Sequence, residues 1–149
     1  MKLLAFDQST TKSGYAVYQD KCLANYGLID YSKENGKEIL MQKTICDMIE
    51  QISPDCVVIE DVALQTNPSV LILLSRLQGA IIQTCSKNNI TCFIIKPTEW
   101  RKKLEFKQGK GVKRKDLKIQ AKDLVLNHFD LTVTEDVAEA ICIGLATIK

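Results

Sequence analysis

The sequence predicts an α/β protein in which a five-stranded mixed sheet, antiparallel at one edge and parallel in the rest, carries helices on both faces. Residues 2–7, 14–20 and 22–30 are short apolar segments separated by tight polar turns, which is typical of an antiparallel meander. The run CVVIE at 56–60 is almost continuously apolar, as in a central strand buried on both faces. Helical segments then alternate with strands, and this order favours a mixed sheet.

Four segments are predicted to be helices, and a fifth strand lies between the second and the third of them. The first carries apolar residues near helical period and ends at Ser53–Pro54. The second is long and apolar, with Pro68 in its first turn, where a missing N–H costs no hydrogen bond. A strand at 91–96 is closed by Pro97. The predicted helices cover residues 37–52, 68–87, 115–128 and 134–148.

Length and composition indicate a single globular domain over residues 1–149. Apolar residues make up 46% of the chain and charged residues 26%, which excludes an intrinsically disordered protein. The longest apolar runs, such as VLILL at 70–74, are far shorter than a membrane span, so we expect no membrane association. The six cysteines form no CxxC pair, which favours reduced thiols, no zinc site and a cytoplasmic location.

The charged residues are unevenly distributed along the chain. Residues 96–122 hold eleven Lys or Arg and three Asp or Glu, a net charge of +8, and the rest of the chain carries −6. Gly109 and Gly111 suit a mobile loop within this segment, and Trp100 and Phe106 could pack or stack. A basic block in an otherwise acidic chain favours contact with nucleic acid, while a solvated lysine-rich surface is the alternative.

Four carboxylates occupy unexpected places. Asp7 ends the first strand and Glu60 ends the central strand. Asp136 and Glu139 share one face of a helix that is otherwise apolar nearly all round, with Cβ atoms roughly 5–6 Å apart. Two half-buried carboxylates repel each other, and a divalent cation removes that cost. Compensation of the helix dipole is an alternative for Asp136, but it does not account for Glu139, which lies further into the helix.

The predicted topology can bring these carboxylates together. If the first and central strands are parallel neighbours, Asp7 and Glu60 emerge side by side, about 4.8 Å apart in strand spacing. A helix packed across the sheet can add Asp136 and Glu139. Oxygen ligands of this kind suit Mg²⁺, with Mn²⁺ as a substitute. Two such ions about 4 Å apart activate a water and stabilise the leaving oxygen in phosphodiester hydrolysis, so the sequence predicts a metal-dependent nuclease.

Three stretches resemble the acidic motifs of the RuvC-type Holliday-junction resolvases of the RNase H-like superfamily: LAFDQSTTKSGYAV, VVIEDV and EDVAEAICIGLA. The resemblance covers nearly the whole chain and looks closest to the bacteriophage-encoded branch. It implies an RNase H-like fold, a homodimer, and an endodeoxyribonuclease that resolves four-way junctions with two metal ions per site. The location it implies is the cytoplasm of a bacterium or of a phage-infected host.

The resemblance also implies roles for individual residues. The family's four catalytic carboxylates fall on Asp7, Glu60, Asp136 and Glu139, the last of which is often aspartate in relatives. The basic segment resembles the family's proline, basic loop and lysine-led helix, and Lys115 matches a lysine near the scissile phosphate. Helix 68–87 is the expected dimer interface, because it carries more aliphatic surface than one sheet face needs. The residues expected to contact DNA are Arg101, Lys102, Lys103, Lys107, Lys110, Lys113, Arg114, Lys115 and Lys118.

Three alternatives follow from the same residues. The loop DQSTTKSG is similar to the phosphate-binding hairpin of sugar kinases and actin-like ATPases. Those proteins need a second such domain, so no nucleotide cofactor is expected. An RNA-processing nuclease of the same fold would use identical chemistry and stays open. A catalytically silent module that binds branched DNA also stays open, although the complete set of four carboxylates argues against it.

Overall fold

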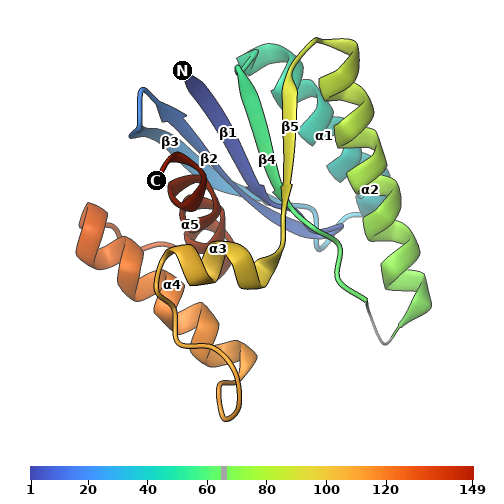
Figure 1. Ribbon diagram of the computed structural model, residues 1–149. Helices are drawn as coiled ribbons and strands as arrows, with labels where there is room; N and C mark the ends of the chain where they lie inside the picture. Colours follow the sequence, from blue (N-terminus) through green and yellow to red (C-terminus); the bar gives the residue numbers. More distant parts are fainter. Residues whose placement is uncertain (65–66) are drawn as a thin grey trace.

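The computed structural model describes residues 1–64 and 67–149 (Figure 1). Five strands form one sheet in the order β3-β2-β1-β4-β5, which confirms the predicted mixed α/β architecture. The strands are β1 (Lys2–Asp7), β2 (Lys12–Gln19), β3 (Cys22–Asp30), β4 (Cys56–Glu60) and β5 (Thr91–Ile95). The helices are α1 (Lys37–Ile52), α2 (Pro68–Lys87), α3 (Pro97–Lys103), α4 (Arg114–Phe129) and α5 (Glu135–Ile148).

The strand pairing places the ends of β1 and β4 beside each other. β1, β2 and β3 form the predicted antiparallel meander, with a register shift at Val17/Tyr18. β1 pairs with β4 in parallel, from Leu3 opposite Cys56 to Phe6 opposite Ile59. Asp7 and Glu60 are the next residues along the two strands, so both emerge at the same edge of the sheet.

The helices form one layer on each face of the sheet. α1 and α2 cover one face, whereas α3, α4 and α5 lie on the other (Figure 1). Alternate residues of the central strands serve the two cores, because successive side chains point to opposite faces. Toward α1 and α2 the sheet presents Leu4, Phe6, Val57 and Ile59, and toward α5 it presents Leu3, Ala5, Cys56 and Val58.

Helix α5 is pressed closely onto the meander. Gly14 of β2 lies directly beneath the first turn of α5, where an added Cβ would fall 1.9 Å from the carbonyl oxygen of Asp136. Further along, the Tyr18 hydroxyl donates a 2.7 Å hydrogen bond to the Ile141 carbonyl. Tyr18 also packs against Gly144, where an added Cβ would fall 2.4 Å from the Tyr18 ring. These contacts fix the position and rotation of the helix that carries Asp136 and Glu139.

Helix α2 buries only part of its apolar surface. Leu77, Ile81 and Cys85 pack into the core, whereas Val70 and Ile72 are exposed. Within the described residues, α2 alone is long and apolar enough to cross a membrane by length and composition. Little of its length is buried, so one apolar side of α2 faces outward. The expected absence of membrane association stays a prediction.

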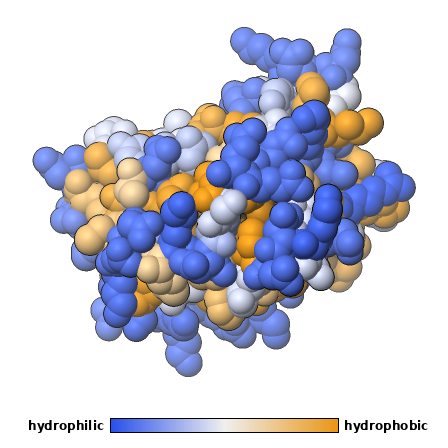
Figure 2. Space-filling view, turned by 90° about the horizontal axis from the view of Figure 1, so that it is seen from above, coloured by the Kyte–Doolittle hydropathy of each residue, from blue (hydrophilic) through white to orange (hydrophobic). Residues whose placement is uncertain are grey.

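The molecular surface is mixed in character. Figure 2 shows hydrophilic side chains over most of the face seen from above, with smaller hydrophobic areas between them. Among the described residues, the six cysteines are free thiols, three of them buried, as the sequence predicts.

The boundaries of some elements differ from those predicted. β2 begins at Lys12, earlier than expected, and the helix predicted to start at Lys115 begins at Arg114. Helix α3 was not predicted, because Pro97 was interpreted only as the end of the preceding strand. Proline is also common in the first turn of a helix, and Pro97 occupies that position in α3.

Candidate active site at the ends of β1 and β4

The four predicted carboxylates gather at one place. Asp7 ends β1, Glu60 ends β4, and α5 places Asp136 and Glu139 above these strand ends. Burial raises the pKa of Asp7 well above its usual range, and the negative charges of Glu139, Glu60 and Asp136 raise it further. A hydrogen bond between Asp7 and Glu139 acts in the same direction. The structure therefore brings the four carboxylates together, and their roles as metal ligands and catalytic residues stay predictions.

Glu60 and Glu139 are also shifted toward their neutral forms. Burial raises the pKa of Glu60, and this outweighs the opposing effects of the Trp100 hydrogen bond and the Arg101 charge. Burial likewise raises the pKa of Glu139, against the opposing charges of Arg101 and Lys118. Burial thus outweighs the nearby cations at both residues, so keeping these carboxylates ionised is costly unless a further cation binds them.

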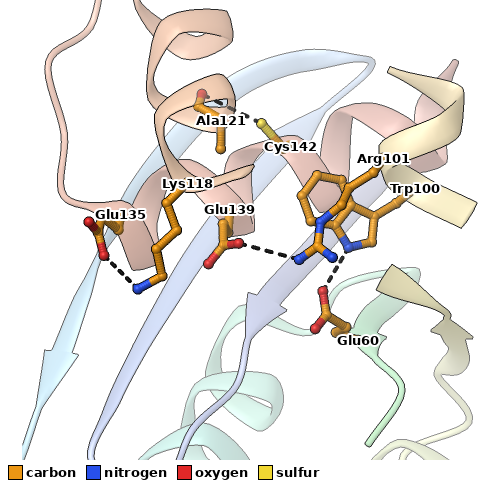
Figure 3. A network of polar contacts seen from close by, with 8 residues as sticks. All are labelled: Glu60, Trp100, Arg101, Lys118, Ala121, Glu135, Glu139 and Cys142. Atoms are coloured by element: carbon orange, nitrogen blue, oxygen red, sulfur yellow. Dashed lines mark hydrogen bonds and ion pairs between the residues drawn. The ribbon is translucent and has the colours of Figure 1, made fainter. Parts of the chain in front are cut away.

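Helix α3 contacts two of the carboxylates through consecutive residues (Figure 3). The indole Nε1 of Trp100 donates a 2.7 Å hydrogen bond to Oε2 of Glu60. Nη2 of Arg101 lies 3.6 Å from Oε1 of Glu139, with side-chain exposures of only 16% and 12%. The Arg101 guanidinium carbon lies 4.8 Å from the centroid of the Trp100 ring, a cation–π contact. Arg101 Nε is buried without a hydrogen-bond partner.

Helix α4 contributes a second cationic side to the site. Lys118 Nζ lies 2.6 Å from Oε2 of Glu135 at the start of α5 (Figure 3). The charge of Arg114, at the N-terminus of α4, lowers the pKa of both Glu60 and Glu139. Its neighbour Lys115 is exposed in the same first turn. Arg114 thus acts on these carboxylates together with Arg101, and the role of Lys115 near a scissile phosphate stays a prediction.

Gln8 ties the ends of β1 and β4 together. Its side-chain oxygen accepts a 3.2 Å hydrogen bond from the Glu60 backbone N–H, and its amide nitrogen donates to the Glu60 carbonyl. Sequence reasoning did not identify Gln8, Trp100 or the Arg101–Glu139 ion pair. Proline in the first turn of a helix was a signal for α3, but no local pattern indicates which distant carboxylate a side chain will meet.

The polar loop after β1 satisfies its hydrogen bonds internally. The Ser13 hydroxyl is buried, donates to the Ser9 carbonyl at 2.8 Å and accepts from the Ser9 N–H at 2.9 Å. Thr11 N–H donates to the Ser9 hydroxyl. These bonds indicate that the loop, which begins directly after Asp7, helps to hold β1 and β2 in register.

The donor set fits a divalent cation of the magnesium type. Four carboxylates offer only oxygen ligands, and three of them have raised pKa values that an added cation would lower. Within the described parts of the chain, no group of three or more His, Cys, Asp or Glu side chains already forms a ready-made metal cage. Glu139 is paired with Arg101 through Oε1, so metal binding at that oxygen requires the guanidinium to move aside, whereas the Trp100 indole contacts only Oε2 of Glu60.

The basic residues predicted to contact DNA fall into two groups. Arg101 and Lys118 form ion pairs with Glu139 and Glu135 and are half-buried. Lys103 donates to the Ala146 carbonyl, although its side chain is largely exposed. The other predicted residues are exposed along α3, the loop before α4 and the first turn of α4: Lys102, Lys107, Lys110, Lys113, Arg114 and Lys115.

The sheet order and the carboxylates at the strand ends define an RNase H-like protein. A profile of the family described as "Crossover junction endodeoxyribonuclease RuvC" matches residues 3–147, and the chain belongs to this family. This confirms the predicted enzyme class, an endodeoxyribonuclease. The placement in the bacteriophage-encoded branch stays a prediction.

Curated relatives agree with this assignment. The chain is 24% identical to a crossover junction endodeoxyribonuclease RuvC of Caldicellulosiruptor saccharolyticus, over 99% of this chain and 92% of the relative. It is 28% identical to the RuvC of Hydrogenovibrio crunogenus, over 94% of this chain and 83% of the relative. The match extends along the whole chain and is not limited to the acidic motifs.

Solved structures share the fold. The Thermus thermophilus RuvC, in complex with Holliday junction substrate, matches with a TM-score of 0.74 at 12% identity, over 98% of this chain and 91% of that one. The fowlpox virus resolvase, in complex with substrate Holliday junction DNA, matches with a TM-score of 0.71 at 17% identity, over 99% and 97%. At these identities the likeness supports the RNase H-like architecture.

Proposed function

We propose that this protein is a metal-dependent, structure-selective endonuclease that nicks branched DNA and resolves four-way junctions. The observation that carries the proposal is the gathering of Asp7, Glu60, Asp136 and Glu139 in a chain of the RuvC family. Their excess negative charge supports a cation site. The exposed basic residues beside it support a polyanionic substrate.

The four carboxylates would hold Mg²⁺, or Mn²⁺ in its place, and two ions per site are part of the proposal. A metal bound there supplies an activated water and offsets the charge that develops on the leaving oxygen. Gln8 holds the Glu60 backbone, and α5 holds Asp136 and Glu139 at a fixed height above the sheet. Arg101 and Arg114 place positive charge beside the carboxylates, which favours the approach of a phosphate.

The DNA path follows the exposed cations of α3, the loop after it and the start of α4. Phosphate contacts position the substrate but carry no base information, so this surface supports recognition of shape more than of sequence. Lys107, Lys110 and Lys113 are exposed and well separated from the carboxylates in sequence, and they suit contacts along a DNA arm. Lys115 is exposed beside Arg114, whose charge reaches Glu60 and Glu139, and it therefore suits a contact near the scissile phosphate.

A symmetric homodimer would supply two such sites to one junction. Resolution of a four-way junction needs two symmetric nicks, and a two-fold dimer provides them. The outward apolar side of α2, including Val70 and Ile72, is the proposed interface. Ile72→Ser should lower the mass measured by light scattering from dimer to monomer. A wild-type monomer at micromolar concentration, unchanged by junction DNA, contradicts the dimer.

The deciding experiment compares substrates of different shape and chemistry. A labelled four-way junction is incubated with the protein in Mg²⁺ beside linear duplex, a flap and single-stranded and duplex RNA. We expect rapid nicking of the junction, little cleavage of linear duplex, and none with Asp7→Asn or Glu60→Gln, which should still bind the junction. Preferential cleavage of RNA would instead favour an RNA-processing nuclease, and binding without any cleavage would favour a silent junction-binding module.

A cytoplasmic location is proposed from the reduced cysteines and is checked by fractionation.

A further inference from the structure

Trp100 has an unusual position for the single tryptophan of the chain. Its side chain is fully buried, on the face of the sheet covered by α5. The Phe106 ring packs against it edge-on, with centroids 5.4 Å apart and an interplanar angle of 74°. The indole has one polar atom, Nε1, and that atom points out of the apolar core to Oε2 of Glu60 (Figure 3).

The chemistry of the indole suits a carboxylate that must also bind a cation. Indole is a donor only, so it fixes one oxygen of Glu60 by a hydrogen bond without adding a positive charge. A lysine or arginine in its place would neutralise the carboxylate and compete with a metal ion for it. Among the described residues, the side-chain hydrogen bond to the Glu60 carboxylate reaches Oε2, so Oε1 can meet another partner. Gln8 meanwhile holds the Glu60 backbone from both sides, so the residue is fixed at its main chain and at its carboxylate.

The geometry points to Trp100 as a positioning residue for Glu60, whose N–H orients the carboxylate that binds the metal. The inference rests on the proposed metal site and adds to it a fully buried residue that supports a metal ligand from within the core. The aromatic packing on Phe106 and the burial of the ring make the donor rigid, because a fully buried indole has little freedom to turn. Removal of such a hydrogen-bond partner typically weakens metal affinity by about 10- to 100-fold.

The test compares two substitutions of the full chain. Trp100→Phe removes the N–H but retains an aromatic ring in the core. Phe106→Leu removes the ring that packs on Trp100 and leaves the N–H in place, so it serves as the matched control for weakened packing. Mn²⁺ binding is measured by titration calorimetry without DNA, and the Mn²⁺ dependence of junction cleavage is measured in single turnovers.

We expect Trp100→Phe to weaken Mn²⁺ binding by about tenfold or more. Its cleavage rate at saturating Mn²⁺ should return to within about threefold of wild type, because high Mn²⁺ restores occupancy of the metal site. Phe106→Leu should bind Mn²⁺ as the wild type does, even if it melts at a lower temperature. Equal Mn²⁺ affinity in Trp100→Phe and wild type overturns the inference, as does an equal loss of affinity in both variants.

A second measurement keeps the inference testable if Trp100→Phe does not fold. The wild-type chain has one indole N–H, which gives one resolved ¹⁵N–¹H indole resonance. That resonance should shift when Mg²⁺ is added and should be displaced already in metal-free Glu60→Gln. An unmoved resonance in both cases overturns the role of Trp100. Failure of the wild-type protein to bind Mn²⁺ at all is a different result, and it overturns the metal site of the proposed function together with this inference.

Discussion

Gly14 offers a direct test of how closely α5 must approach the sheet. An added Cβ at this position would lie 1.9 Å from the Asp136 carbonyl oxygen, 2.3 Å from its carbonyl carbon and 2.8 Å from the Val137 nitrogen. All three are backbone atoms of the helix, so no side-chain rotation relieves the clash. Ordinary contact begins near 3.4 Å, and the first turn of α5 must therefore move by about 1.5 Å in Gly14→Ala.

This displacement should reduce catalysis more than folding. Overpacking of a core costs about 1–3 kcal/mol, which lowers the melting temperature by roughly 2–12 °C. A displacement of about 1 Å in an active site can reduce the rate about 100-fold. We therefore expect Gly14→Ala to remain folded, to bind junction DNA in Ca²⁺, and to cleave it about 100-fold more slowly in Mg²⁺.

Gly79 provides the matched control. It lies in α2 with no atom within 4 Å of an added Cβ, so Gly79→Ala should leave cleavage unchanged and gain up to about 1 kcal/mol of helix stability. Light scattering checks that the assembly state is unaltered. Single-turnover cleavage, junction binding and thermal unfolding are measured for both variants. A folded Gly14→Ala that cleaves at the wild-type rate refutes the claim that this contact sets the height of Asp136.

The remaining predictions concern charge. Because burial and neighbouring carboxylates raise the pKa of Asp7, its contribution to stability is largest below the ordinary carboxyl pKa and is lost as the pH rises toward the raised value. Thermal unfolding in EDTA should therefore show falling stability through that range, and saturating Mg²⁺ should suppress the decline. Replacing Lys107, Lys110 and Lys113 by glutamate should weaken binding to every DNA and reduce the slope of log affinity against log salt by about 0.9 for each phosphate that is no longer neutralised. An unchanged salt slope would place the DNA path elsewhere. Lys115→Ala should lower the single-turnover cleavage rate more than the affinity measured in Ca²⁺, and equal reductions would make it an ordinary phosphate-binding residue.

The sequence predicts which carboxylates form the site and which elements carry them, but not the side-chain contacts within the site. Asp7 and Glu60 could be identified because each is a charged residue at the end of an apolar strand. Asp136 and Glu139 could be identified because they lie on a helix that is otherwise apolar. Their meeting depends only on strand order and helix packing. Topology rules limit these to few choices.

The contacts made by α3 could not be predicted in the same way. Trp100 and Arg101 follow a proline within a basic segment, and their local pattern is typical of an exposed loop or a surface helix. Their partners, Glu60 and Glu139, are 40 and 38 positions away along the chain. Which side chains meet across such a distance depends on the angle at which α3 leaves β5, and no residue pattern specifies that angle. The same reasoning applies to Lys118, whose charge was assigned to DNA but is paired with Glu135.

The close contact between Gly14 and Asp136 also has a consequence for biosynthesis. The meander that contains Gly14 is complete by Asp30, whereas the helix that rests on it is the last element of the described chain. The hydrogen bond from Tyr18 to Ile141 spans 123 positions, so it forms only when both ends of the chain are present. A nascent chain halted before Glu135 would possess the basic segment but only half of the carboxylates. Under the proposed function, such a fragment would keep the cations that attract DNA but lack a complete metal site, so cleavage would require the synthesis of α5.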